Sequence, residues 1–343
     1  MKSFQLSLIC IALVGVNGCQ SQTDKQVKAE ATNHMSQSVY QVEFEAAQTF
    51  SLQTNKLAQQ FQAYCAGSAE LDEAKSQWRA TMESWMALQG QERGPEQALA
   101  QSWNVQFWPD KKNTTGRKMS ALTKQDKIWT AEQISQQSVT VQGLGSLEWL
   151  LYDKNVVLSH EDQVCQTSVA ISQNLANNAQ VIAMAWQENP WKALDEKAWT
   201  SEYIALLSNQ LEYSMKKMSR PLAKIGQPRP YFSESWRSQT SMYNLKANVE
   251  AMRTLYMADG NGLDRLLRQR DKANLADRIQ RQFDMTIDTW PMETSLFELL
   301  QTKEGYRIAY SNYNKLEQLK YLIHEEVAIE LGVVIGFNAT DGD

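Results

Sequence analysis

Histidine is scarce in this chain: its 343 residues include three, His34, His160 and His324. A hydrolytic metal centre takes about three protein ligands and keeps one position open. The segment His324-Glu325-Glu326 lacks the second histidine, four residues beyond the first, that a zinc-protease helix carries. The chain also lacks a Gly-x-Ser-x-Gly elbow for a serine nucleophile. These absences argue against a peptidase.

Proline and glycine are also few, with 7 and 15 residues, and few segments alternate apolar and polar side chains. Both features favour helices over sheet. The formal net charge is −5, and a mildly acidic chain argues against nucleic acid as a partner. Beyond the amino terminus no uninterrupted apolar stretch is long enough to span a bilayer, so we expect a soluble body.

The amino terminus has the pattern of a secretory signal followed by a lipid-attachment cysteine. Lys2 precedes an apolar run from Leu6 to Val16. The segment Val16-Asn17-Gly18-Cys19 then has the pattern of a lipoprotein cleavage site. We predict a signal peptide over residues 1–18 and a lipid anchor on Cys19; the alternative is an ordinary cleaved signal with an incidental cysteine. Gln20, rather than Asp, follows the cysteine and favours the outer membrane. We therefore expect a lipoprotein on the periplasmic side of the cell envelope, held by its acyl chains.

The mature chain is predicted to begin with a tether and to continue in long helices. Residues 19–40 are mostly small and polar, which predicts a flexible, lipid-anchored segment. Apolar residues at helical spacing, such as Phe44, Phe50, Leu57 and Phe61, follow. The expected helices cover about 42–64, 70–88, 161–186, 202–225, 235–256, 263–290 and 303–331. This layout predicts an all-α fold of two packed helical bundles.

Two cysteines remain in the mature body, Cys65 and Cys165, each near an end of an expected helix. The envelope permits disulfides, so we favour a Cys65–Cys165 bridge. The alternative is two separate buried thiols.

The segment GLGSLEWLLYD, residues 143–153, places one carboxylate, Glu148, within an apolar helical pattern. Its helical neighbours include Leu144, Gly145 and Leu151. A buried carboxylate needs a partner or a functional reason, because burying a bare charge is expensive. We predict that Glu148 turns into a cleft between the bundles; the alternative is that it points to solvent beside Ser146 and Trp149.

This segment resembles the Gly-x-His-x-x-Glu signature of the imelysin-like family. Gly143 and Glu148 match it, while Gly145 stands at the histidine position. Three further blocks are similar to those of the family's lipoprotein branch, in the same order. These blocks are Ser102 to Asp110 with Thr115-Gly116-Arg117, Trp236-Arg237-Ser238 with Ser241, Asn244 and Asn248, and Gly336 to Asp343.

The resemblance implies two related helical bundles, and a boundary near Asn189-Pro190 divides the chain into residues 41–190 and 191–343. It also implies a link to iron-regulated uptake and the binding of a metal or small ligand. The family is catalogued among metallopeptidases, but Gly145 offers no imidazole for that chemistry.

The motif blocks supply the candidate residues for a ligand-binding cleft. Trp108, in a rigid aromatic turn, is either a pocket wall or a structural plug. Arg117 and Arg237 carry guanidinium groups suited to a carboxylate, which makes either one a candidate partner of Glu148. The predicted cleft residues are Glu148, Gly143, Arg117, Trp108, Trp236, Arg237, Ser238 and Asn244.

Three functions follow, in order of preference. The first is an envelope-anchored protein that binds a small ligand or a metal. Glu148 is then a candidate metal ligand, for iron or another divalent ion, although one carboxylate alone cannot hold it. The second is a structural lipoprotein that binds an envelope protein partner and keeps a vestigial cleft. The third is a metallopeptidase.

Overall fold

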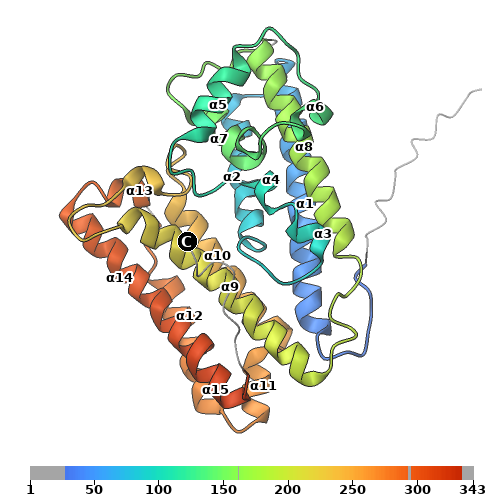
Figure 1. The fold of residues 1–343 in the computed structure, drawn as a ribbon, viewed down its shortest axis with the longest axis vertical. Coiled ribbons are helices and arrows are strands. Elements are labelled where there is room, and N and C mark those ends of the chain that lie inside the picture. The colour runs from blue at the N-terminus through green and yellow to red at the C-terminus, as the bar shows by residue number, and fades with distance from the viewer. Residues whose placement is uncertain (1–27, 161, 293–294, 334–343) are drawn as a thin grey trace, which may run out of the picture.

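The computed structural model describes residues 28–160, 162–292 and 295–333. Within these ranges the regular elements are helices joined by loops, and none is a β-strand (Figure 1). The all-α prediction is confirmed. Cys19 and the carboxyl-terminal block from Gly336 lie outside the described residues. Within those residues, no helix has the length and apolar character needed to cross a membrane.

Three long helices form the N-terminal half. They are α1 (Gln37–Cys65), α2 (Leu71–Met86) and α8 (Gln163–Ala185), and α1 packs against both of the others. Their contacts bury apolar side chains at helical spacing, among them Phe50 and Phe61 of α1 and Trp78 of α2. Glu70 and Glu73 form a capping box that starts α2.

Short elements connect α2 to α8 and carry two of the four motif blocks. They are α3 (Glu96–Leu99), α4 (Ser102–Val105), α5 (Thr114–Thr123), α6 (Ala131–Ser135), η1 (Val139–Val141) and α7 (Gly143–Tyr152). The signature segment forms α7, which packs against α2, α5 and α8.

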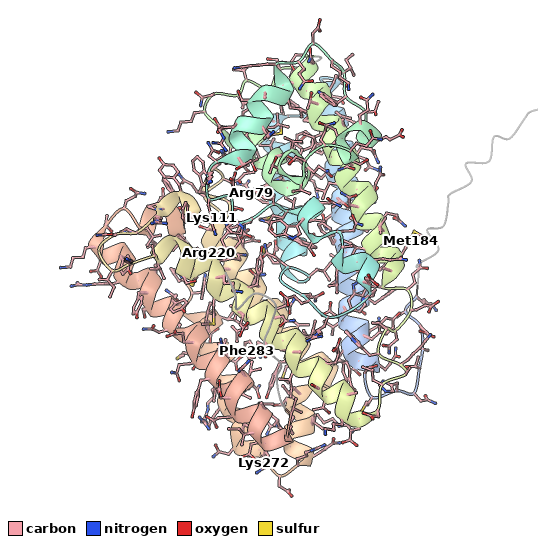
Figure 2. The ribbon with its side chains drawn as sticks, in the orientation of Figure 1. Arg79, Lys111, Met184, Arg220, Lys272 and Phe283 are labelled. Atoms are coloured by element: carbon pink, nitrogen blue, oxygen red, sulfur yellow. A yellow bond between two sulfur atoms is a disulfide. The ribbon has the colours of Figure 1, made fainter. Side chains whose placement is uncertain are left out.

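The C-terminal half is a second group of helices. Its elements are α9 (Glu196–Leu222), η2 (Pro230–Phe232), α10 (Ser241–Met257), η3 (Ala258–Gly260), α11 (Leu263–Gln269), α12 (Ala273–Asp288), α13 (Leu296–Leu299), α14 (Lys303–Lys320), η4 (Tyr321–Val327) and α15 (Ala328–Leu331). Figure 2 shows Phe283 of α12 inside this half, and Met184 on the outer surface of α8.

The two halves meet along α10, which contacts α1 and α2 of the first half and α9 and α12 of the second (Figure 1). The expected boundary at residue 190 falls in the connection between α8 and α9. The separation into domains 41–190 and 191–343 stays a prediction.

Several element boundaries differ from expectation. Residues 235–240 form a turn, with positive φ at Ser235 and Gln239, so α10 begins at Ser241 and not at 235. The expected helix 263–290 is two helices, because Asp271 adopts a left-handed conformation (φ 59°) that ends α11. The last long helix contains a π-helical stretch, η4.

The described part of the expected tether, residues 28–40, packs against the body, so the predicted end of the tether at residue 40 is wrong. The His34 ring donates to the Leu194 carbonyl at 2.7 Å, and the Tyr40 hydroxyl donates to the Trp186 carbonyl at 3.0 Å. Apolar side chains such as Val39 and Tyr40 are fully buried, which favours helix from Gln37 onward.

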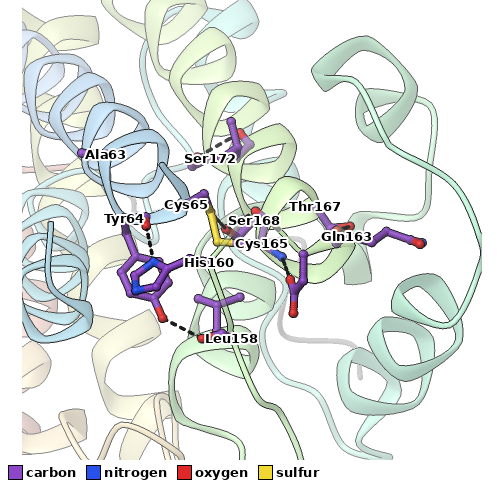
Figure 3. Close-up of a disulfide and its surroundings, with 12 residues drawn as sticks. Ala63, Tyr64, Cys65, Leu158, His160, Gln163, Cys165, Thr167, Ser168 and Ser172 are labelled. Carbon is purple, nitrogen blue, oxygen red and sulfur yellow. Dashed lines mark hydrogen bonds between the residues drawn. A yellow bond between two sulfur atoms is a disulfide. The ribbon is translucent and has the colours of Figure 1, made fainter. Parts of the chain in front are cut away.

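The predicted Cys65–Cys165 disulfide is confirmed (Figure 3). It joins the end of α1 to the first turn of α8, with a Cα–Cα distance of 5.7 Å. Asp162 caps α8 by accepting from the Cys165 N–H at 2.6 Å. The Tyr64 hydroxyl, beside the bridge, donates to the Leu158 carbonyl at 2.6 Å.

Candidate functional site

The signature helix α7 begins with a close approach of backbone to backbone. Gly143 has a φ of 67°, and a Cβ atom there would stand 2.1 Å from the carbonyl oxygen of Val105. Only glycine fits this position. Gly143 therefore acts by letting the start of α7 approach the end of α4 closely, and it does not line the pocket around Glu148.

Glu148 is 6 % exposed, and one of its oxygens, Oε1, accepts three hydrogen bonds from the turn before α10. The backbone N–H of Arg237 donates at 3.1 Å, and the N–H and hydroxyl of Ser238 each donate at 2.9 Å. The carboxylate thus ties the N-terminal half to the C-terminal half.

Burial raises the pKa of the Glu148 carboxyl above its usual value, and the nearby Glu234 adds to this rise. The hydrogen bonds from Ser238 and the positive charge of Arg237 oppose the effect. The net direction is upward, so the site favours the neutral carboxyl more than water does.

Arg237 binds a different carboxylate with its side chain. Its Nε donates to Asp153 Oδ2 at 2.9 Å, its Nη2 donates to Asn113 Oδ1 at 2.7 Å, and its guanidinium carbon lies 4.2 Å from the Trp236 ring centre. Burial is the largest single influence on the pKa of Asp153 and raises it, but the hydrogen bonds from Arg237 and Asn155 and the charge of Arg237 together outweigh burial, and the net pKa is lowered. Two acids of the signature segment, Glu148 and Asp153, therefore bind one turn.

The Gly116-Arg117 pair takes part in this joint through its glycine. A Cβ on Gly116 would stand 2.5 Å from Asn113 Oδ1 and 3.0 Å from Arg237 Nη2, so a side chain there would displace both groups. Arg117 itself is exposed, and among the described residues its guanidinium makes no contact with Glu148. The guanidinium pairing expected for Glu148 is thus replaced by backbone and hydroxyl donors.

A cavity of about 40 Å³ lies beside Glu148 and is lined by Trp108, Trp236 and Arg237, among others. Gly145 also lines it, and a Cβ there would find no atom nearer than 4.0 Å. The Ser233 hydroxyl is buried next to it and has no hydrogen-bond partner within the described part of the chain. This volume suits about one water molecule.

The donor set of this cavity does not fit a metal centre. Across the described ranges, no three His, Cys, Asp or Glu side chains come together as metal ligands. The Oε1 atom of Glu148 is already occupied by three donors. His34 and His160 bind backbone carbonyls elsewhere in the fold.

Sequence reasoning missed a second buried charge pair next to this cavity. Lys217 Nζ lies 2.6 Å from Glu234 Oε2, and both side chains are almost fully buried. Lys217 also donates to Gln89 Oε1 at 2.8 Å and to Asn248 Oδ1 at 2.6 Å. Burial lowers the pKa of Lys217, while the attraction of Glu234 opposes that shift. Lys217 lies on the same face of α9 as the buried Gln210 and Ser214. This spacing is the sequence signal from which the burial of Lys217 could have been predicted.

The predicted polar face of α10 is buried at the junction of the halves. Asn244 donates to Ser235 Oγ at 3.0 Å, and Asn248 donates to the Met86 carbonyl at 2.8 Å. Asn244 therefore supports the turn that holds Glu148 but does not line the cavity.

A larger cleft, of about 410 Å³, adjoins the small cavity at Trp108. Trp108 and Gln106 line both the small cavity and this cleft. Its remaining lining comes from α2 and the loop after it, from α3 and α4, and from Tyr213 of α9. The cleft therefore opens where the two halves meet, close to the predicted site.

A family model described as Imelysin matches residues 44–323. The structure is similar to an imelysin-like protein from Psychrobacter arcticum, with a TM-score of 0.72 and 18 % identity over 91 % of this chain and 100 % of that one. It is also similar to an iron-regulated protein A precursor from Parabacteroides distasonis, with a TM-score of 0.64 and 14 % identity over 88 % of this chain and 97 % of that one. No curated protein matches the chain.

Proposed function

The chain belongs to the imelysin family, and from this membership and the cleft beside Trp108 we propose that it is a lipid-anchored binding protein of the cell envelope. Its ligand is a small organic molecule. The observation that carries the proposal is the cleft itself, whose volume of about 410 Å³ is within the range of small-molecule sites.

Glu148 serves this function by positioning other residues. Its three hydrogen bonds hold the Arg237–Ser238 turn, and the neighbouring Trp108 forms a wall of the cleft. The carboxylate holds the two halves in a fixed relative position, and the aromatic side chains of the cleft contact the ligand.

A metallopeptidase is the least supported function. Gly145 stands where the family signature has an imidazole, and the described residues supply no three-ligand cluster. A hydrolytic metal needs such a set together with an open position.

A structural lipoprotein with a protein partner is the second candidate, and a specific surface favours it. An open groove of about 700 Å³ on the C-terminal half is lined by Tyr306 and Tyr310 of α14, and none of the predicted cleft residues lines it. The same groove supplies a control position for a test of the cleft.

The test is native mass spectrometry of the lipoprotein purified from its own envelope in mild detergent. We expect a bound small molecule that Trp103→Ala loses and Tyr310→Ala keeps; these side chains are 53 % and 42 % exposed, so both changes spare the core. A protein partner without a small molecule would support the structural function instead. A bound metal without a small molecule would support a metal-binding function and contradict this proposal.

Anchoring at the periplasmic face of the outer membrane is part of the proposal and rests on the sequence around Cys19. Cys19→Ser should release the protein to the soluble periplasm or block its processing. Fully processed protein that still fractionates with membranes would contradict the lipid anchor.

A link to iron supply is also proposed, on the ground that one similar structure is described as an iron-regulated protein A precursor. Growth of the cells with and without iron, followed by immunoblotting for the protein, tests this link.

A further inference from the structure

The aromatic cleft has walls of three indoles and one phenol. Trp85, Trp103, Trp108 and Tyr213 all line it, and Trp108 and Tyr213 meet edge to face with ring centres 5.7 Å apart. Trp85 and Trp108 are buried, whereas Trp103 is 53 % exposed. Trp103 is therefore the indole most open to an incoming ligand.

The polar groups of the cleft floor are already engaged. Gln89 Nε2 donates to Gln106 Oε1 at 2.5 Å and to Glu234 Oε1 at 2.6 Å, and its Oε1 accepts from Lys217 at 2.8 Å. Gln106 also accepts from the Trp85 indole at 3.0 Å. A polyhydroxylated ligand would have to break these bonds, because it needs free donors and acceptors.

The charges around the cleft favour a cation. Glu92 is the one charged residue among the described residues that line it; it is exposed and forms no ion pair in that part of the chain. The buried Lys217 behind the floor is balanced by Glu234 at 2.6 Å. Arg220 acts on Tyr213 by its charge, but it does not line the cleft. An anion would therefore meet a carboxylate in the lining and no basic side chain there.

We propose that the cleft binds a small organic cation with an alkylated ammonium group. The faces of aromatic rings attract such a cation, and the attraction does not require the hydrogen bonds that the floor has used. Glu92 supplies charge at the open rim. This inference rests on the proposed binding function and adds the chemical class of the ligand.

The test compares two probes of the same shape, choline and 3,3-dimethylbutan-1-ol, by ligand-observed NMR on the detergent-solubilised full lipoprotein. Choline should bind roughly 5- to 30-fold more tightly, which corresponds to the strength of cation–aromatic contacts. Trp103→Ala should weaken choline about 5-fold or more. Glu92→Gln, an exposed change that cannot disturb the core, should weaken it about 2- to 3-fold and reduce the salt dependence.

Tyr310→Ala is the control and should leave choline binding unchanged, because Tyr310 lines the other groove. Equal binding of the two probes, or stronger binding of N-acetylglucosamine, would overturn the cation proposal. Absence of probe binding, with a native small molecule still lost in Trp103→Ala, would overturn the ligand class alone. Absence of both would overturn the binding function as well.

Discussion

Ser238 donates two hydrogen bonds to the same oxygen of Glu148, one from its backbone N–H and one from its hydroxyl, each at 2.9 Å. The two residues belong to different halves of the molecule and lie 90 residues apart in sequence. The signature glutamate therefore organises an interface, and two of the three donors to its Oε1 atom are backbone N–H groups, which a sequence motif does not reveal.

Glu148→Ala should destabilise the protein by about 2–4 kcal/mol, because it removes the acceptor of two backbone N–H groups and leaves the Ser238 hydroxyl with the Ser235 carbonyl at 3.1 Å. Glu148→Gln keeps an acceptor oxygen for these donors. It also removes the cost of burying the carboxylate charge, which is the cost that raises the pKa of Glu148, so this variant should change stability by no more than about 1 kcal/mol. Urea unfolding of both variants measures the difference. Equal losses in the two variants would show that the acceptor is not what matters.

Stability should fall as pH rises from about 4.5 to about 8, in part because of Glu43. Burial raises the pKa of this carboxyl from 4.5 to about 8, and Gln91 donates a hydrogen bond to it at 2.6 Å. Between these pH values the folded protein keeps a proton that the unfolded chain has lost, so the contribution present at low pH disappears.

Glu43→Gln should remove about 3–5 kcal/mol of this decline and make the protein more stable than the parent at pH 8. Denaturant unfolding at pH 5, 6.5 and 8 measures it. Glu45→Gln, at an exposed position on the same helix, is the matched control. Parallel pH curves for the parent and Glu43→Gln would refute the assignment.

Lys217→Met should cost about 3–5 kcal/mol, because it leaves the buried Glu234 without its cation. Adding Glu234→Gln in the same chain should recover part of the loss, since the uncompensated charge is then gone. Thermal or urea unfolding of the single and double variants gives the coupling energy. Strict additivity would mean that the two side chains do not stabilise each other.

Cys165→Ser should lower the free energy of unfolding by about 2–5 kcal/mol, because the bridge to Cys65 restricts a long loop of the unfolded chain. The double variant with Cys65→Ser should lose a similar amount, and reductant should no longer affect either protein. A stability equal to that of the parent under oxidising conditions would contradict this.

The helices could be predicted because apolar residues such as Phe50 and Phe61 recur at helical spacing, whereas the break at Asp271 depends on one left-handed residue between two good helical patterns. The burial of Glu148 was evident from its apolar neighbours. Its partners were not, because every residue carries a backbone N–H and only the tertiary fold chooses the N–H groups of Arg237 and Ser238. The buried face of Gln210, Ser214 and Lys217 on α9 is a signal for Lys217, but its partner Glu234 could not be predicted, because buried and exposed glutamates look identical in sequence.

The bridge between Cys65 and Cys165 turns everything from α2 to α7, and with it most of the cleft and Glu148, into a closed covalent ring. Exposed connections at Ile128 and Val157, with side chains 72 % and 76 % exposed, are the places where a protease would cut this ring. One such cut opens the ring but releases no fragment, because both ends remain attached through sulfur. A molecule nicked in this way would keep its amino-terminal segment, its aromatic walls and its C-terminal half in one piece until a reductant separates them.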